Sequence, residues 1–197
     1  MGTVRTVDEI LIRAPLERVF QVASGVERWP AILPHYRWVR FLDRRDGGGT
    51  VEMAAWRPFG LLRYPVWWVS EMTVDRRACE VRYRHVRGIT RGMDVLWRLV
   101  PQRNVLQDSA LPSPPFRVGT PSGTAQPEAV LVTVVHEWRG PAWPLVGPLA
   151  ASLVIGPVFI HGIASRTLAG IKRELERERG PRAAGPGSAG LGPSKGG

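Results

Sequence analysis

A stripe of apolar residues near the C-terminal end constrains this chain more than any other feature. From Gly156 onwards, apolar side chains recur every three or four residues, at Ile160, Ala164, Leu168, Ile171 and Leu175. This spacing predicts an α-helix with one apolar face. Pro157 suits the first turn of that helix, and Gly180-Pro181 suits its end. An amphipathic helix has to cover an apolar surface, so we expect the rest of the chain to supply one.

The chain has no Lys, Arg, Asp or Glu between Arg139 and Arg166, a stretch long enough to suggest a bilayer-spanning helix. Three prolines, Pro144, Pro148 and Pro157, interrupt it, and the apolar stripe continues past Arg166 into a charged segment. This pattern favours a helix that packs on a protein surface over one that spans a membrane.

Seven segments upstream have the alternation and β-branched content of strands, and two short segments suit helices. The strands are predicted at 4–13, 36–43, 50–57, 66–74, 79–87, 91–101 and 129–139, and the short helices at 16–24 and 27–33. The order is one strand, two short helices, six consecutive strands and one long helix. It predicts an α+β fold, in which a curved, seven-stranded antiparallel sheet wraps on the C-terminal helix and leaves a space beneath it.

Two segments are too rich in Pro, Gly, Ser and Thr to bury an apolar core. Residues 102–128 hold five prolines and interrupt a connection between strands, so we predict a proline-rich insertion there. Residues 181–197 are predicted to be a disordered tail. The expected organisation is therefore one ligand-binding domain, residues 1–180, followed by the tail.

Composition narrows the class of protein. A single cysteine, Cys79, excludes an internal disulfide and a cysteine-rich metal site, and residues 1–13 have no signal-peptide pattern, so we expect a cytoplasmic protein. The net charge is +10, and all but two of the 27 basic residues are arginines. No nucleic-acid-binding motif accompanies this charge, so we expect no nucleic-acid partner. No catalytic triad, phosphate loop or dinucleotide fingerprint is present, and we expect neither a cofactor nor a metal.

Short motifs distributed along this order carry a family resemblance. They are Ile12-Arg13-Ala14-Pro15, Val26-Glu27-Arg28-Trp29-Pro30, His85-Val86-Arg87-Gly88, Trp97-Arg98-Leu99 and His136-Glu137-Trp138, with Ile163 to Lys172 at the end. The sequence resembles the START-like superfamily, also called SRPBCC, and in particular its polyketide cyclase/dehydrase and coenzyme-Q-binding branch. The resemblance implies a helix-grip fold with a deep apolar cavity between sheet and helix. It implies no single function, because the superfamily includes lipid carriers, quinone binders, aromatase/cyclases and hormone receptors.

Strand alternation predicts which polar and aromatic side chains point toward the helix. It selects Tyr83, His85, Arg87, Trp97, His136 and Trp138. His161 extends the stripe of the helix, and Trp56 is added as a strand tryptophan that would suit a flat ligand, which completes the candidate ligand-binding residues. The histidines have three interpretations, which the sequence leaves open: hydrogen bonding within the interior, orientation of a carbonyl or phenol on a ligand, or acid–base catalysis.

The sequence therefore predicts a domain that binds a hydrophobic small molecule, such as a lipid, a quinone or a polyketide-like compound. We expect a cavity of roughly 300–1,000 Å³. One alternative is an aromatic polyketide cyclase/dehydratase that uses a cavity histidine, tyrosine or arginine for proton transfer. The other is a peripheral membrane interaction module that contacts lipid through the apolar segment Phe59–Tyr64.

Overall fold

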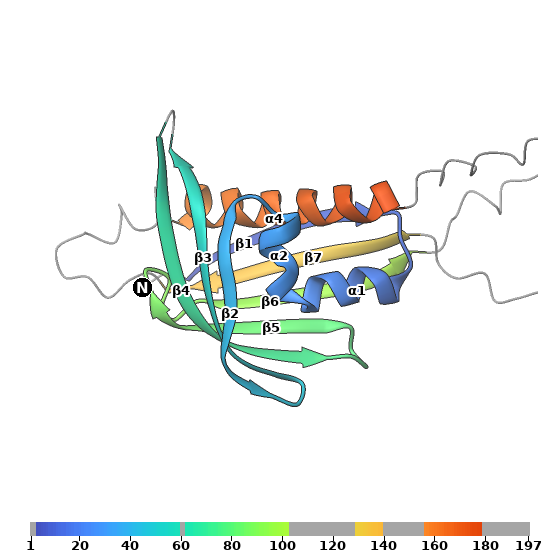
Figure 1. The fold of residues 1–197 in the computed structure, drawn as a ribbon, viewed down its shortest axis with the longest axis horizontal. Coiled ribbons are helices and arrows are strands. Elements are labelled where there is room, and N and C mark those ends of the chain that lie inside the picture. The colour runs from blue at the N-terminus through green and yellow to red at the C-terminus, as the bar shows by residue number, and fades with distance from the viewer. Residues whose placement is uncertain (1–2, 60–61, 103–128, 140–155, 179–197) are drawn as a thin grey trace, which may run out of the picture.

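The computed structural model describes residues 3–59, 62–102, 129–139 and 156–178 (Figure 1). The strands are β1 (Val4–Ile12), β2 (Tyr36–Arg45), β3 (Gly48–Phe59), β4 (Leu62–Asp75), β5 (Glu80–Gly88), β6 (Asp94–Gln102) and β7 (Ala129–Trp138). The helices are α1 (Leu16–Ser24), the 3-10 turn η1 (Val26–Arg28), α2 (Trp29–Ile32) and α4 (Gly156–Glu178). Nearly all of the predicted insertion, 102–128, and the whole predicted tail, 181–197, lie outside the described residues.

The seven strands form one antiparallel sheet in the order β1-β7-β6-β5-β4-β3-β2. The predicted α+β helix-grip architecture is confirmed, including the placement of β7 beside β6. The first and last strands pair with each other over their whole length, from Val4 opposite Trp138 to Ile12 opposite Val130. The sheet curves strongly, so that the β3–β4 hairpin rises past the N-terminal end of α4 (Figure 1).

Helix α4 lies across the sheet, and the predicted stripe faces inward from Ala164 to Leu175 (Figure 1). Leu168, Ile171 and Leu175 are each buried, and the helix contacts β1, β7, α1 and α2. Truncating a side chain as buried as these to alanine typically costs about 2–5 kcal/mol of stability, so this stripe fixes the helix on the sheet. Among the described residues, no helix has an apolar run long enough to cross a bilayer.

The β3–β4 hairpin is longer than the sequence predicts. The apolar residues 58–65 were expected to form a connection, but the ladder continues through them to the pair Phe59 and Leu62. Prolines are tolerated in this ladder, where Pro65 lies opposite Trp56 and Pro58 lies opposite Arg63. The predicted helix at 27–33 is instead divided between η1 and α2.

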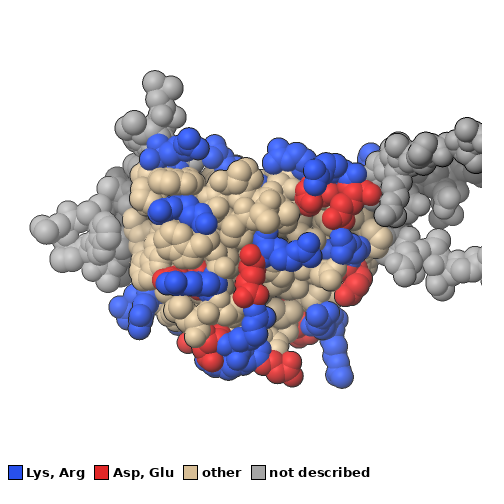
Figure 2. All heavy atoms as spheres, in the orientation of Figure 1, with Lys and Arg blue, Asp and Glu red and all other residues tan. Residues whose placement is uncertain are grey.

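The positive charge is spread over the surface and is partly paired. Figure 2 shows basic side chains across the viewed face with acidic residues among them. Glu80 lies 2.9 Å from Arg98 and 2.5 Å from Arg82, and Glu52 pairs with Arg40. This distribution is that of a solvated surface rather than one concentrated basic patch on the viewed face.

Candidate functional site

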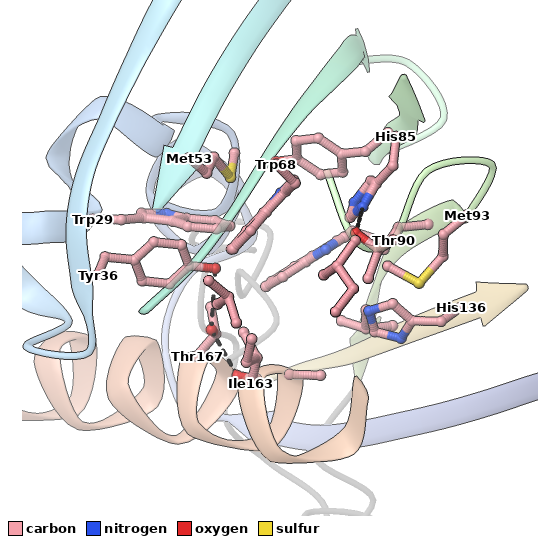
Figure 3. A pocket seen from close by; sticks show the side chains of 17 residues that line it. Trp29, Tyr36, Met53, Trp68, His85, Thr90, Met93, His136, Ile163 and Thr167 are labelled. Carbon is pink, nitrogen blue, oxygen red and sulfur yellow. Dashed lines mark hydrogen bonds between the residues drawn. The ribbon is translucent and has the colours of Figure 1, made fainter. Parts of the chain in front are cut away.

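A cavity of about 80 Å³ lies between the sheet and α4. The strands β2 to β7 and the helices α2 and α4 all contribute to its wall (Figure 3). Most of the wall is apolar, and the largest side chains in it are Trp29, Tyr36, Trp68 and Trp97. Its polar lining residues are Tyr83, His85, Thr90, His136 and Thr167.

The cavity is smaller than the 300–1,000 Å³ that we expect from the sequence. Aromatic rings fill much of the space between sheet and helix. The ring of Trp29 lies 5.1 Å from that of Tyr36 and 5.6 Å from that of Trp97, measured between centroids. These distances are typical of packed aromatic pairs, so the rings themselves limit the free volume.

Four of the eight candidate residues line this cavity: Tyr83, His85, Trp97 and His136. They come from three adjacent strands, β5, β6 and β7. Tyr83 on β5 and His136 on β7 are both paired with Val95 on β6, which lies between these two strands. The tyrosine and the histidine therefore lie on either side of Val95. Alternation along each strand was therefore sufficient to select these side chains.

Trp56 was wrongly assigned to the cavity. The inward row of β3 is Met53, Ala55 and Arg57, so Trp56 lies on the opposite face of the sheet. Its side chain is 36% exposed, and the guanidinium of Arg37 lies 4.6 Å from its ring centroid. Trp56 belongs to an outer cation–π contact rather than to the ligand site.

Trp138 and Arg87 also lie outside the observed lining. Trp138 is 1% exposed, and its indole nitrogen donates to the carbonyl oxygen of Arg91 at 3.1 Å, so it acts as a core residue. Arg87 is exposed, as expected for a guanidinium that would be costly to bury. His161 belongs to α4, but its side chain lies outside the described part of the chain.

The turn between β5 and β6 positions His85. The amide of His85 donates to Met93 O at 2.9 Å, and the amide of Gly92 donates to His85 O at 2.8 Å. This closed turn brings Thr90 Oγ1 to 2.6 Å from His85 Nδ1, and both side chains are buried (Figure 3). The imidazole also stacks on Trp68, with 6.0 Å between centroids and 12° between planes.

The turn depends on a glycine at its start. Gly88 has a φ of +94°, which only glycine adopts readily, and a Cβ there would lie 2.4 Å from the carbonyl oxygen of Trp67. The glycine therefore lets β5 run close to β4 where both strands enter the cavity wall.

Burial keeps the ionisable groups of the cavity neutral. It lowers the pKa of His85 to about 3, with a further contribution from His136, and it lowers the pKa of His136 to about 4. It also raises the pKa of Tyr83 and of Tyr36 above the usual range of a phenol. At neutral pH the cavity therefore presents uncharged imidazoles and phenols in an apolar surrounding.

One polar group of the cavity stands apart from the others. The hydroxyl of Tyr83 is buried and has no hydrogen-bond partner among the described residues. The hydroxyl of Tyr36 lies 3.5 Å from Thr167 Oγ1, and Thr167 in turn donates to Ile163 O at 2.9 Å. An unsatisfied buried hydroxyl is uncommon in folded proteins and is a natural contact for a ligand or a water molecule.

Sequence reasoning missed several lining residues. Trp68 and Tyr36 could have been found by alternation along their strands. Thr90 and Thr167 carry no such signal, because a turn brings Thr90 to the cavity and helix packing brings Thr167 there. Within the part of the chain that the structure describes, no three His, Cys, Asp or Glu side chains are placed to hold a metal ion.

The fold and the cavity define a START-like, helix-grip protein. The family model described as "Polyketide cyclase / dehydrase and lipid transport" matches residues 12–155. The chain therefore belongs to this family within the START/SRPBCC superfamily.

Two curated relatives match about half of the chain. One from Streptomyces halstedii is 35% identical over 99 residues, which cover 47% of this chain and 84% of the relative. One from Streptomyces cyaneus is 34% identical over 99 residues, which cover 47% of this chain and 60% of that protein. Both carry the name "Putative polyketide cyclase".

Solved structures share the fold at low sequence identity. The Zhui aromatase/cyclase from Streptomyces sp. R1128 has a TM-score of 0.68 at 18% identity, covering 93% of this chain and 99% of its own. TTHA0849 from Thermus thermophilus has a TM-score of 0.64 at 18% identity, covering 90% of this chain and 99% of its own. The family match supports a polyketide-related role, and the solved structures show the fold.

Proposed function

We propose that this protein binds the uncharged, ring-bearing part of a hydrophobic small molecule in the cavity between the sheet and α4. A polyketide-like aromatic compound fits the family best, and a lipid or a quinone has the same apolar character. The observation that carries the proposal is the buried hydroxyl of Tyr83, which has no partner among the described residues and belongs to a mostly apolar cavity wall.

The polar groups suit recognition of a neutral ligand. The Tyr83 hydroxyl can donate to a ligand carbonyl or accept from a ligand phenol. Thr90 engages Nδ1 of His85, so Nε2 is the ring nitrogen that a ligand would meet. Because the imidazoles are neutral at physiological pH, each offers one hydrogen bond without the cost of burying a charge.

Ligand entry requires the cavity to enlarge. A volume of about 80 Å³ accommodates a few water molecules but not a polycyclic compound. Met53 and Met93 line different parts of the wall, and methionine side chains rearrange easily because they are unbranched. We propose that these two side chains move when a ring system binds.

Binding of 1,8-dihydroxyanthraquinone, followed by quenching of tryptophan fluorescence, tests this function. The wild-type protein should bind it saturably, and Tyr83→Phe should weaken binding roughly three- to tenfold, the scale of one neutral hydrogen bond. Trp56→Phe is the matched control, since Trp56 lies outside the cavity, and its affinity should stay within about twofold. Absence of saturable binding, or equal losses in the two variants, would refute the proposal. Native mass spectrometry of the purified protein would identify any ligand retained from the cell.

The second candidate function is an aromatic polyketide cyclase/dehydratase. The names of the relatives favour it, together with the proximity of Tyr83, His85 and His136 on neighbouring strands. With a pKa of about 3 or 4, either histidine would act at neutral pH as a base or a hydrogen-bond donor, not as a protonated acid.

A reconstituted minimal polyketide synthase distinguishes a cyclase from a binding protein. Under the cyclase hypothesis, adding the protein changes the distribution of cyclised products, and His85→Phe or His136→Phe reduces that change ~100-fold while ligand binding persists. A binding protein leaves the product distribution unchanged. The membrane contact through Phe59–Tyr64 stays a prediction, because residues 60–61 lie outside the described part of the chain.

A further inference from the structure

An arginine continues the inward row of β3. Arg57 follows Met53 and Ala55 on the face that looks toward α4, and it is only 6% exposed. Its Nη2 atom lies 3.8 Å from the position that a Cβ on Gly162 would occupy. The guanidinium therefore lies against the helix, where glycine leaves room for it. Tyr64 is its cross-strand neighbour on β4.

A second arginine projects from the same region of α4. Arg166 follows Gly162 by one helical turn and is exposed at the surface. Its charge lowers the pKa of His35, after the larger effect of burial. The pKa of Arg57 is lowered to about 10, first by burial, with Tyr64 opposing and Arg166 adding to the shift. The charge of Arg166 therefore acts on both neighbours, and Arg57, with a pKa of about 10, stays protonated at pH 7.

Neither arginine is among the described lining residues, but both meet α4 next to residues of the cavity wall. Ile163 and Thr167 line the cavity, and each follows directly after Gly162 or Arg166 on α4 (Figure 3). The ring of His35 also reaches this point, with Nε2 3.1 Å from Thr167 Oγ1. Ile163 and Thr167 of the cavity wall are therefore the next residues on α4 after Gly162, which Arg57 approaches, and after Arg166.

We infer that Arg57 and Arg166 form a subsite for an oxyanion, a carboxylate or a phosphate, carried by the ligand whose apolar body occupies the cavity. The inference rests on the proposed function. Guanidinium groups present a planar fork that matches these anions. The preferred ligand is then an amphiphile with one acidic end, and these two arginines select it over its neutral analogue.

Three naphthalene compounds test the subsite: 2-naphthamide, 2-naphthoate and 2-naphthyl phosphate. They share one ring system and differ in the charged group, and isothermal titration calorimetry at pH 7 gives each affinity. The wild-type protein should bind at least one anion about tenfold more tightly than the amide, the scale of one charge-assisted hydrogen bond. Preference for naphthoate alone identifies a carboxylic acid, and preference for the phosphate alone identifies a phosphate ester.

Variants separate the subsite from general attraction to a basic protein. Arg166→Met should reduce the preference for the anion about fivefold or more and leave 2-naphthamide binding within about twofold. Arg173→Met removes an exposed charge seven residues further along α4 and should change the preference little. Because Arg57 is buried, Arg57→Lys is used beside Arg57→Met, and folding of each is checked by circular dichroism.

Several results would overturn the inference. Equal affinities for the three compounds would leave the cavity as a binding site and remove the anion subsite. Equal effects of Arg166→Met and Arg173→Met would assign the preference to net charge instead. Failure of all three compounds to bind would refute the proposed function, and the subsite with it.

Discussion

Replacing Tyr83 with phenylalanine should separate stability from binding. The substitution removes one hydroxyl and keeps the ring, which is 6% exposed in the cavity wall. In the wild-type protein that hydroxyl has no partner among the described residues, so folding removes it from water without a protein hydrogen bond in return. We therefore expect the variant to be more stable than the wild type and to bind ligand less tightly.

The magnitude follows from the surroundings of the hydroxyl. An unsatisfied buried hydroxyl costs about 1–3 kcal/mol. The adjoining cavity of about 80 Å³ is large enough for water, which reduces the cost, so we expect a gain near ~1 kcal/mol. For a domain of this size, that gain raises Tm by about 2–4 °C. Tyr36→Phe should have the opposite sign, because the Tyr36 hydroxyl lies 3.5 Å from Thr167 Oγ1 and loses that contact.

Urea unfolding of ligand-free protein, followed by circular dichroism, measures both variants against the wild type. The expected order of stability is Tyr83→Phe, then wild type, then Tyr36→Phe, with similar slopes against urea concentration. A loss of about 1 kcal/mol or more in Tyr83→Phe would show that the hydroxyl has a partner in the folded protein. In that case the argument from an unsatisfied group would fail, and so would its use as a ligand contact.

The remaining predictions concern acid sensitivity and the β5–β6 turn. The folded-state pKa values of His85 and His136, about 3 and 4, lie below the usual 6.5, so these groups are neutral in the folded protein and bind protons on unfolding. Stability is then fully present above pH 6.5 and falls from pH 6.5 down to about 4 for His136 and about 3 for His85, by up to ~1.4 kcal/mol per pH unit for each histidine. Thermal unfolding at several pH values should show a shallower fall in His136→Gln, and an unchanged slope would contradict the pKa argument. Gly88→Ala should lower Tm more than Gly92→Ala, because both have positive φ but only a Cβ on Gly88 would strike backbone, 2.4 Å from Trp67 O. Equal Tm losses would show that the close contact at Gly88 is relieved by small shifts.

Local patterns in the sequence determined most of the architecture. The spacing of Leu168, Ile171 and Leu175 predicts the face of α4 that is buried, and the succession of strand-like segments predicts the antiparallel sheet that this face covers. These features depend on the repeat of the backbone, about 3.6 residues for a helix and two for a strand, so they can be read without knowledge of distant contacts. The same reasoning placed Tyr83, His85, Trp97 and His136 on the inward face.

Long-range packing decided the rest of the candidate site. Trp56 was expected in the cavity as a tryptophan on a strand, without an assignment of the two faces of β3. Arg57 in fact lies on the inward face, and neighbouring residues of a strand point to opposite faces. The approach of Thr90 to His85 requires a turn held by Gly88 and Gly92. The small volume of the cavity, the neutrality of its histidines and the meeting of Arg57 with α4 depend on which distant side chains fill the same space. Burial and desolvation are properties of that space, so only the tertiary structure determines them.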